Sequence, residues 1–266
     1  MEKNLDFRNK QIHYSQSGNG PCLVLLHGFL ESLQIWDSFR QPLENDFTVI
    51  CIDLPGFGKS DVFSENHNMD FMAEVVYAVL QENKIDQCVM AGHSMGGYVS
   101  LAFARNYPAM LKGLCLYHSH AAADNEEAKE NRNRTLEIVD KGKKNFINNF
   151  IPTLFAKGNV AAFDEQIEQL KAWARETSAE GIKAALQGMR DRQSQLNLLT
   201  ETDIPIQFII GKQDKKIPFN KILAQVSLCR HSEIIFLREA GHMGFVEAPK
   251  ICLQAMTSFA KNAHTN

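Results

Sequence analysis

The sequence predicts an α/β protein with a mostly parallel, doubly wound sheet and a helical insertion. Short apolar runs typical of buried strands alternate with amphipathic helical stretches, which indicates a parallel sheet with helices on both faces. This alternation stops after residue 120, where strand patterns vanish, and it returns at residue 203. We therefore expect a core of residues 1–120 and 203–266, with residues 121–202 as a helical cap over one end of the sheet.

The composition is that of a globular protein, with 22% charged and 44% hydrophobic residues. The net charge of −3 and the lack of a long Lys or Arg run argue against a nucleic-acid partner. No apolar run approaches the ~20 residues of a membrane span, and no signal-peptide pattern precedes the first strand. The six cysteines form no C-x-x-C pair, which favours free thiols in a reducing compartment. We expect a cytoplasmic protein without a membrane partner.

The first half of the chain supplies most of the predicted sheet. Residues 7–15 contain a turn at Asn9-Lys10 between two β-like pieces, which predicts a hairpin. The continuous apolar run of residues 22–26 then predicts a strand buried on both faces of a parallel sheet. Further strands are expected at residues 47–52, 87–91 and 114–117. Apolar positions at helical spacing predict a helix over 69–82 and a second helix that begins at Met95.

The insertion and the last quarter of the chain complete the pattern. Residues 121–202 are rich in Ala, Glu, Lys, Gln and Leu, and their balanced charges fit a solvated helical lid. Two further strands are expected at 204–210 and 233–237, followed by a terminal helix over about 249–261.

The stretch Gly92-His93-Ser94-Met95-Gly96 lies between a predicted strand and a predicted helix. In that context the pattern G-x-S-x-G indicates a sharp turn that exposes the serine, with glycines where a Cβ atom would clash. An ordinary strand–loop–helix joint is the alternative. A serine hydroxyl is a poor nucleophile unless a base is placed beside it.

Asp214 and His242 each follow a predicted strand directly. The carboxyl ends of parallel strands meet at one sheet edge, so we expect both side chains near Ser94. The order Ser, Asp, His fits a catalytic triad in which Ser94 attacks, His242 transfers the proton and Asp214 orients the imidazole. The backbone N–H groups of Phe29 and Met95 are the candidate oxyanion hole. Taken singly, Asp214 is also a good turn former and His242 an ordinary turn residue.

Several other residues are candidates for the substrate pocket. His118 and His120 follow a strand and are expected to line the pocket or to meet the cap, since no pattern around them completes a metal site. We expect neither a metal nor a cofactor. Phe146, Phe150 and Phe155 lie in an apolar cluster of the cap that forms either a pocket wall or lid core.

These motifs together resemble the α/β-hydrolase superfamily, in particular its small, cap-bearing, carboxylesterase-like serine hydrolases. The matching pieces are His27-Gly28-Phe29 with Trp36, Asp53-Leu54-Pro55-Gly56-Phe57-Gly58-Lys59-Ser60, Gly92-His93-Ser94-Met95-Gly96-Gly97, Gly211-Lys212-Gln213-Asp214 and Gly241-His242. The resemblance implies hydrolysis of a small-molecule carboxylic ester or thioester through an acyl-serine intermediate. Ser94 separates the chain from relatives similar to haloalkane dehalogenases and epoxide hydrolases, which carry an aspartate there.

Three alternatives to a small-ester hydrolase stay open at this point. A thioesterase would use the same triad. Carbon–carbon bond hydrolases of the superfamily share the elbow, but their usual Gly-Pro-Gly oxyanion loop differs from Phe29-Leu30-Glu31-Ser32. A ligand receptor of the same fold would keep the triad residues without useful turnover.

Overall fold

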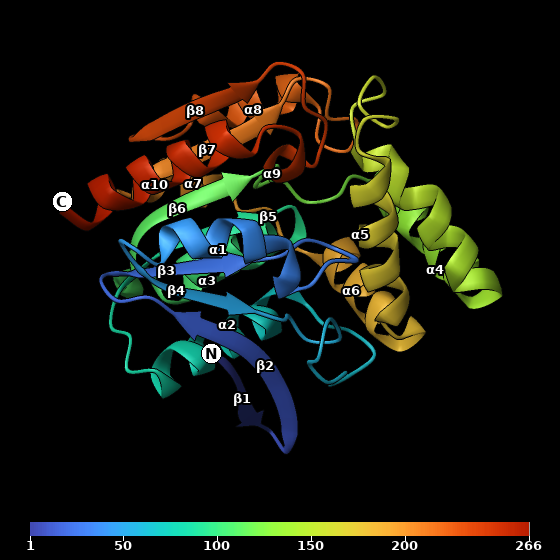
Figure 1. The fold of residues 1–266 in the computed structure, drawn as a ribbon, viewed down its shortest axis with the longest axis horizontal. Helices are drawn as coiled ribbons and strands as arrows, with labels where there is room; N and C mark the ends of the chain where they lie inside the picture. Colours follow the sequence, from blue (N-terminus) through green and yellow to red (C-terminus); the bar gives the residue numbers. More distant parts are fainter. Residues whose placement is uncertain (266) are drawn as a thin grey trace.

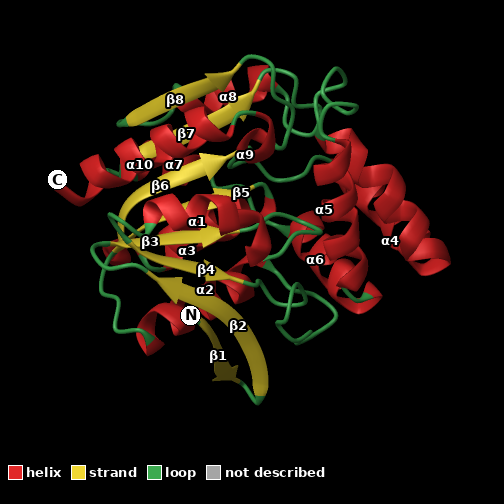
Figure 2. Cartoon of the chain, viewed as in Figure 1, coloured by secondary structure: helices red, strands yellow, loops and turns green. Residues whose placement is uncertain are grey.

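The structure, a computed structural model that describes residues 1–265, is built on one eight-stranded sheet (Figures 1 and 2). The strand order is β1-β2-β4-β3-β5-β6-β7-β8. The strands are β1 (Glu2–Phe7), β2 (Lys10–Ser17), β3 (Cys22–Leu26), β4 (Thr48–Ile52), β5 (Cys88–His93), β6 (Leu111–Tyr117), β7 (Ile206–Gly211) and β8 (Ser232–Leu237). Strand β2 is antiparallel to both of its neighbours, whereas all pairs from β4 to β8 are parallel. The predicted α/β fold is confirmed.

The N-terminal hairpin is longer than the sequence pattern indicated. Its arms run from Glu2 to Ser17, and its turn lies at Arg8-Asn9, one residue earlier than expected. Both turn residues have positive φ, 54° and 63°. A two-residue hairpin loop favours this geometry because its twist matches that of the two strands.

Helices cover both faces of the sheet. The core helices are α1 (Asp37–Leu43), α2 (Met69–Glu82), α3 (Met95–Asn106), α8 (Phe219–Val226), α9 (Gly244–Glu247) and α10 (Pro249–Thr265), with 3-10 turns at Leu33–Trp36 and Pro108–Met110. Helices α1 and α10 lie in front of the sheet in Figure 1, and α2 and α3 lie behind it. Helix α2 begins after Asn68, whose Oδ1 accepts the Phe71 N–H at 2.8 Å, and it buries Val75 and Val79.

The strands that carry the candidate site are completely buried. Every residue of β3, β5 and β7 is buried. For β3 this confirms the prediction made from the apolar run of residues 22–26. All six cysteines carry free thiols, and five of them are buried. Across residues 1–265, none of the helices combines the length and the apolar character that a bilayer crossing requires.

A helical insertion separates β6 from β7. It contains α4 (Glu126–Phe150), a 3-10 turn at Ile151–Leu154, α5 (Asp164–Glu176), α6 (Ala179–Asp191) and α7 (Leu196–Glu201). Helices α4, α5 and α6 stand together beyond the carboxyl ends of the strands, on the right of Figure 1. The predicted helical insertion is confirmed, and it overlies the sheet edge where the candidate catalytic residues were expected.

Helix α6 meets the core through small residues on one of its faces. The carbonyl oxygen of Ala184 accepts the N–H of His67 at 3.0 Å, so helix backbone touches core backbone. A Cβ atom on Gly181 would collide with the carbonyl oxygen of Gly56, and one on Gly188 with that of His67. The absence of side chains at these two positions therefore sets how closely the insertion approaches the core.

Replacing Gly188 with alanine is expected to destabilise the protein. The new methyl group meets backbone, which cannot rotate away, and overpacking of this kind costs about 1–3 kcal/mol. That cost exceeds the ~1 kcal/mol that alanine gains over glycine within a helix. Urea unfolding followed by tryptophan fluorescence measures the change. Gly158→Ala is the matched control, because nothing lies within 4 Å of its added Cβ. A Gly188→Ala protein as stable as the wild type would contradict this account of the contact.

Candidate active site

Ser94 lies in a strained backbone turn between β5 and α3. Its φ and ψ angles are 49° and −111°, outside the regions that L-residues favour. The surrounding structure holds this conformation by hydrogen bonds. The Ser94 N–H donates to the Tyr117 carbonyl at 2.9 Å, and its own carbonyl accepts from the Ser119 hydroxyl at 2.8 Å and from the Gly97 N–H at 3.0 Å. A conformation of this kind costs about 1–3 kcal/mol and is typical of functional sites.

Three glycines leave the space that the turn requires. A Cβ atom on Gly92 would collide with the backbone of Gly96, and one on Gly97 with the Ser119 side chain. A Cβ atom on Gly96 would lie 2.5 Å from the carbonyl oxygen of Leu26 in the adjacent strand β3. The glycines of the motif are thus required by close backbone approach.

Asp214 and His242 are in direct contact at the same sheet edge. The His242 Nδ1 lies 2.7 Å from the Asp214 Oδ2, and both residues are buried. Since Asp214 is ionised, this ring nitrogen donates the hydrogen bond. Asp214 follows β7, and His242 lies in the loop between β8 and α9. The structure therefore brings together two of the predicted triad residues by a hydrogen bond.

The Asp214 carboxylate has three further donors. Its Oδ1 accepts the N–H groups of Lys216 and Ile217 at 2.8 and 3.0 Å, and its Oδ2 also accepts from the His118 Nδ1 at 3.2 Å. Burial alone would raise the pKa of Asp214, but His242 and His118 hold it well below its usual range. Burial lowers the pKa of His118 to about 4, so this ring is neutral at neutral pH.

The candidate ligand atoms of His118, Asp214 and His242 lie within 4.8 Å of one another, a spacing that would suit a metal ion. In this structure the same atoms are engaged with each other, because both imidazole N–H groups point at the carboxylate. The trio is therefore a hydrogen-bonded cluster in which both rings donate to the Asp214 carboxylate.

A buried charge pair lies beside the candidate nucleophile. The Glu31 Oε2 accepts the Gly28 N–H at 2.5 Å and contacts the His93 Nδ1 at 2.9 Å, while the His93 Nε2 lies 2.9 Å from the His242 carbonyl oxygen. Both partners of the His93 ring are acceptors, so both ring nitrogens donate and the ring is an imidazolium. This pair links the loop after β3 to the His242 loop.

The pKa values of His93 and Glu31 are shifted in the directions expected for an imidazolium paired with a carboxylate. Burial opposes the charge on His93, but the Glu31 carboxylate outweighs it and the pKa of His93 is raised. Burial likewise opposes the charge on Glu31, and the His93 ring outweighs it, so the pKa of Glu31 is lowered. The sequence analysis did not predict the pairing of Glu31 with His93. The position of a carboxylate directly after the apolar Leu30 could have indicated a buried acidic group.

Ser94 and His242 line one cavity of about 180 Å³. The helical insertion supplies part of its wall through Arg132, Phe150, Leu154 and Met189. Phe29 closes the wall on the core side, where its ring packs edge-on against Phe150 with 6.1 Å between centroids. The insertion also fixes the His242 loop, because the His242 N–H donates to the Leu154 carbonyl at 2.7 Å.

The two candidate oxyanion donors lie at this cavity or beside it. Phe29 lines it directly. Met95 is the first residue of α3, so its N–H is one of the amides that lack an acceptor inside the helix.

Of the five candidate pocket side chains, Phe150 lines this cavity and the other four do not. Phe146 stacks behind Phe150, with ring centroids 5.3 Å apart. Phe155 is buried in the insertion against Phe163. The His118 ring contacts the Asp214 carboxylate. Helical spacing identified the apolar cluster but not which of its members turn toward Ser94, because that depends on how the insertion docks.

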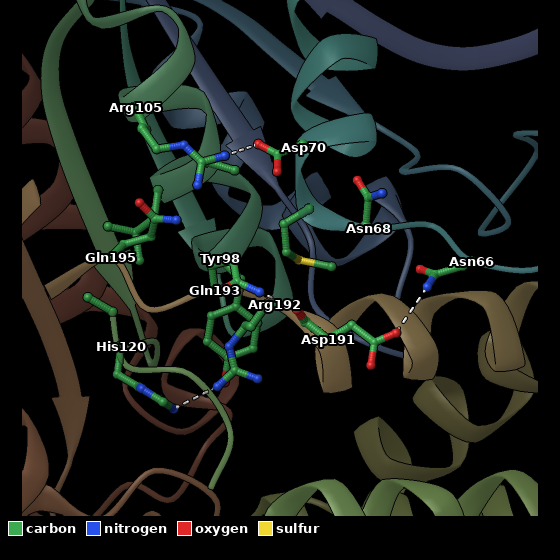
Figure 3. Close-up of a pocket in the computed structure, with 14 residues that line it drawn as sticks. Asn66, Asn68, Asp70, Tyr98, Arg105, His120, Asp191, Arg192, Gln193 and Gln195 are labelled. Atoms are coloured by element: carbon green, nitrogen blue, oxygen red, sulfur yellow. Dashed lines mark hydrogen bonds and ion pairs between the residues drawn. The ribbon is translucent and has the colours of Figure 1, made fainter.

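His120 lines a second cavity of about 220 Å³, shown in Figure 3. The Arg192 guanidinium lies 4.0 Å from the centroid of the Tyr98 ring, and its Nη2 lies 3.5 Å from the His120 Nε2. Burial, with the charge of Arg192, lowers the pKa of His120 to about 3. Tyr98 lines both cavities and separates His120 from the Ser94 side.

A model of the alpha/beta hydrolase fold family matches residues 21–249. The chain belongs to the α/β-hydrolase family. This α/β-hydrolase is 28% identical over 257 residues to a pimeloyl-[acyl-carrier protein] methyl ester esterase of Aeromonas hydrophila, covering 93% of this chain and 98% of the relative. A malate-bound thermophilic esterase from Thermogutta terrifontis has a TM-score of 0.93 and 30% identity, with 99% of each chain covered. An esterase from Exiguobacterium antarcticum shares the fold, with a TM-score of 0.90, 20% identity and coverage of 98% and 100%.

The Glu31–His93 pair predicts a specific pH dependence of stability. Because the pKa of His93 is higher in the folded protein than in the unfolded chain, its protonation stabilises the fold fully below the ordinary value of 6.5. That contribution is lost as the pH rises through the folded pKa. Glu31→Gln removes the partner of a buried cation, which typically costs about 3–5 kcal/mol. We expect the difference in unfolding free energy between wild type and Glu31→Gln to be large at pH 6 and smaller at pH 9.

Urea unfolding at the two pH values measures this difference. Glu82→Gln, a change at an exposed carboxylate, is the control and should give a small difference at both. A Glu31→Gln difference that is the same at pH 6 and pH 9 would show that His93 is not the charged partner.

Proposed function

We propose that this α/β-hydrolase is a serine hydrolase that cleaves carboxylic esters of small to medium size through an acyl-serine intermediate. The observation that carries the proposal is the shared cavity of Ser94 and His242, with the His242 Nδ1 held 2.7 Å from the buried Asp214 carboxylate. Relatives named as esterases, at 28% and 30% identity over most of the chain, support the reaction class.

Each residue has a defined role in the proposed first half-reaction. The Ser94 Oγ attacks the ester carbonyl carbon while the His242 Nε2 takes the hydroxyl proton. Asp214 keeps the Nδ1–H in place and stabilises the imidazolium that forms. The carbonyl oxygen becomes an oxyanion, and the N–H groups of Phe29 and Met95 donate to it. When the tetrahedral intermediate collapses, the bond to the alcohol oxygen breaks and that oxygen takes the proton from His242.

Water completes the proposed cycle. His242, again neutral, removes a proton from a water molecule whose oxygen attacks the acyl carbon. Collapse of the second tetrahedral intermediate releases the carboxylic acid and returns the proton to the Ser94 Oγ. None of these steps requires a cofactor.

The size of the substrate follows from the proposed cap of residues 121–202. A cavity of about 180 Å³ is smaller than the ~300–1,000 Å³ of typical ligand pockets. Phe150, Leu154 and Met189 make its cap side largely apolar. These dimensions favour short acyl and alcohol groups over long chains.

Loss of the Ser94 hydroxyl is expected to remove ester hydrolysis. Ser94→Ala should lower kcat on p-nitrophenyl acetate and butyrate by about 10⁴-fold or more, because the nucleophile is gone while the fold is kept. Ser227→Ala, at an exposed serine outside the cavity, is the matched control and should behave as wild type. Undiminished turnover by Ser94→Ala would contradict the proposed nucleophile.

The same assay separates the remaining reaction classes. We expect a higher kcat/KM on short esters than on acyl-CoA thioesters or ring-fission diketones at equal concentration. A preference for either of the latter two would assign the triad to thioester or carbon–carbon bond hydrolysis instead.

A further inference from the structure

Two cationic side chains from distant parts of the sequence line the cavity beside Ser94. Arg132 extends from helix α4 of the insertion, and Lys216 lies in the loop after β7 that also carries Asp214. Cations on the wall of a partly enclosed cavity attract an anionic group, unless nearby carboxylates already neutralise them.

Arg132 shares its only carboxylate partner among residues 1–265 with a second arginine. Its Nε donates to the Asp124 Oδ2 at 2.5 Å, while the Arg192 Nη1 donates to the Asp124 Oδ1 at 2.6 Å. Burial alone would raise the pKa of Asp124, but the two guanidinium groups lower it, so the carboxylate is ionised. One negative charge thus faces two positive ones, and a net positive charge remains.

The two arginines differ in what remains available to a ligand. Arg192 is buried, and its guanidinium also donates to the carbonyl oxygens of Met189 and Ala122. The Arg132 side chain is 21% exposed. Within the part of the chain that the structure describes, its two terminal nitrogens have no hydrogen-bond partner. Arg132 therefore presents free N–H donors on the cavity wall.

Lys216 presents the second charge. Its ammonium lies 4.5 Å from the centroid of the Phe150 ring, which lines the same cavity. Among residues 1–265 no carboxylate forms an ion pair with the Lys216 Nζ, and burial lowers the pKa of this lysine while the Asp214 charge opposes that shift. The aromatic ring thus holds this ammonium beside the cavity by a cation–π contact without neutralising it.

The carboxylates near the cavity already accept hydrogen bonds from other groups. Glu31 lines the cavity, but its charge is balanced by the His93 imidazolium and its Oε2 accepts two donors. Asp214 accepts four donors, two from imidazole rings and two from backbone amides. Neither carboxylate forms an ion pair with Arg132 or Lys216, although the Asp214 charge attracts the Lys216 ammonium.

We propose that the preferred substrate is an ester that carries a second, ionised carboxylate, which Arg132 and Lys216 bind while Ser94 attacks the ester carbonyl. A guanidinium with free N–H groups matches the geometry of a carboxylate, and the ammonium adds charge. A neutral ester would displace water from both cations without replacing its hydrogen bonds. This inference deepens the proposed function and rests on it.

The small cavity limits the length of such a substrate. Half-esters of short dicarboxylic acids place the charge in the acyl part, and acyl esters of short hydroxy acids place it in the alcohol part. Both offer the same carboxylate, so the experiment includes one of each.

The test compares kcat/KM for esters matched in size but not in charge. Monoethyl succinate is paired with ethyl valerate, and 3-acetoxypropanoate with butyl acetate. In the wild type, for at least one pair, the kcat/KM of the anionic ester is expected to exceed that of the neutral ester at least tenfold. That anionic-to-neutral ratio is expected to fall at least tenfold in Arg132→Met and in Lys216→Met, mainly through KM. Arg132→Lys should recover part of the ratio because it restores the charge.

Lys215→Met is the matched control, since Lys215 is an exposed neighbour in the same loop that does not line the cavity. It should leave the ratio unchanged, whereas high salt should reduce the ratio in the wild type by screening. Testing Arg132 and Lys216 separately keeps the inference testable if either variant misfolds. Good turnover of the neutral esters with ratios near one would overturn this inference and leave the proposed function intact. Failure to hydrolyse any of the four esters would overturn both.

Discussion

The backbone turn at Ser94 is the constraint on which the rest of the site depends. An L-residue at φ 49° and ψ −111° persists only where its surroundings oppose relaxation. Here the opposition comes from β6, which accepts the Ser94 N–H at Tyr117, and from glycines that let α3 pass against β3. The result is a serine raised at the start of a helix, with the helix amides beside it. The packing of β6 and α3 around this turn thus determines the position of the Ser94 side chain.

The same constraint recurs around the site. Leu30 and His118, which follow β3 and β6, also have positive φ, 63° and 47°. These two residues flank Ser94 at the carboxyl edge of adjacent strands, so the strained turns gather where the candidate chemistry is. Their positions are coupled by buried polar contacts. Glu31, next to Leu30, pairs with His93, and His118 contacts Asp214. Strain in the turns is offset by this network and by the completely buried strands beneath it.

Sequence reasoning recovered the sheet, the helical insertion and the contact between Asp214 and His242, because each depends on local pattern or on the rule that parallel strands end at one edge. It did not recover what depends on packing between distant segments. The sequence pattern does not distinguish Gly181 and Gly188 from other helix residues, because their role depends on how closely α6 packs against the backbone of the core. Arg132 and Asp124 lie eight positions apart in the chain, and their partner Arg192 comes from another helix end. His118 was expected at the pocket, but its ring contacts the Asp214 carboxylate and does not line the cavity of Ser94.

Covalent labelling tests most directly the proposal that Ser94 is the one reactive serine. The protein would be incubated with diisopropyl fluorophosphate, and intact mass and peptide mapping would give the stoichiometry and the site of modification. We expect one phosphoryl group per chain, on the peptide that contains Ser94, and no labelling of a folded Ser94→Ala protein. A folded wild type that stays unlabelled, or carries the group on another serine, would contradict it.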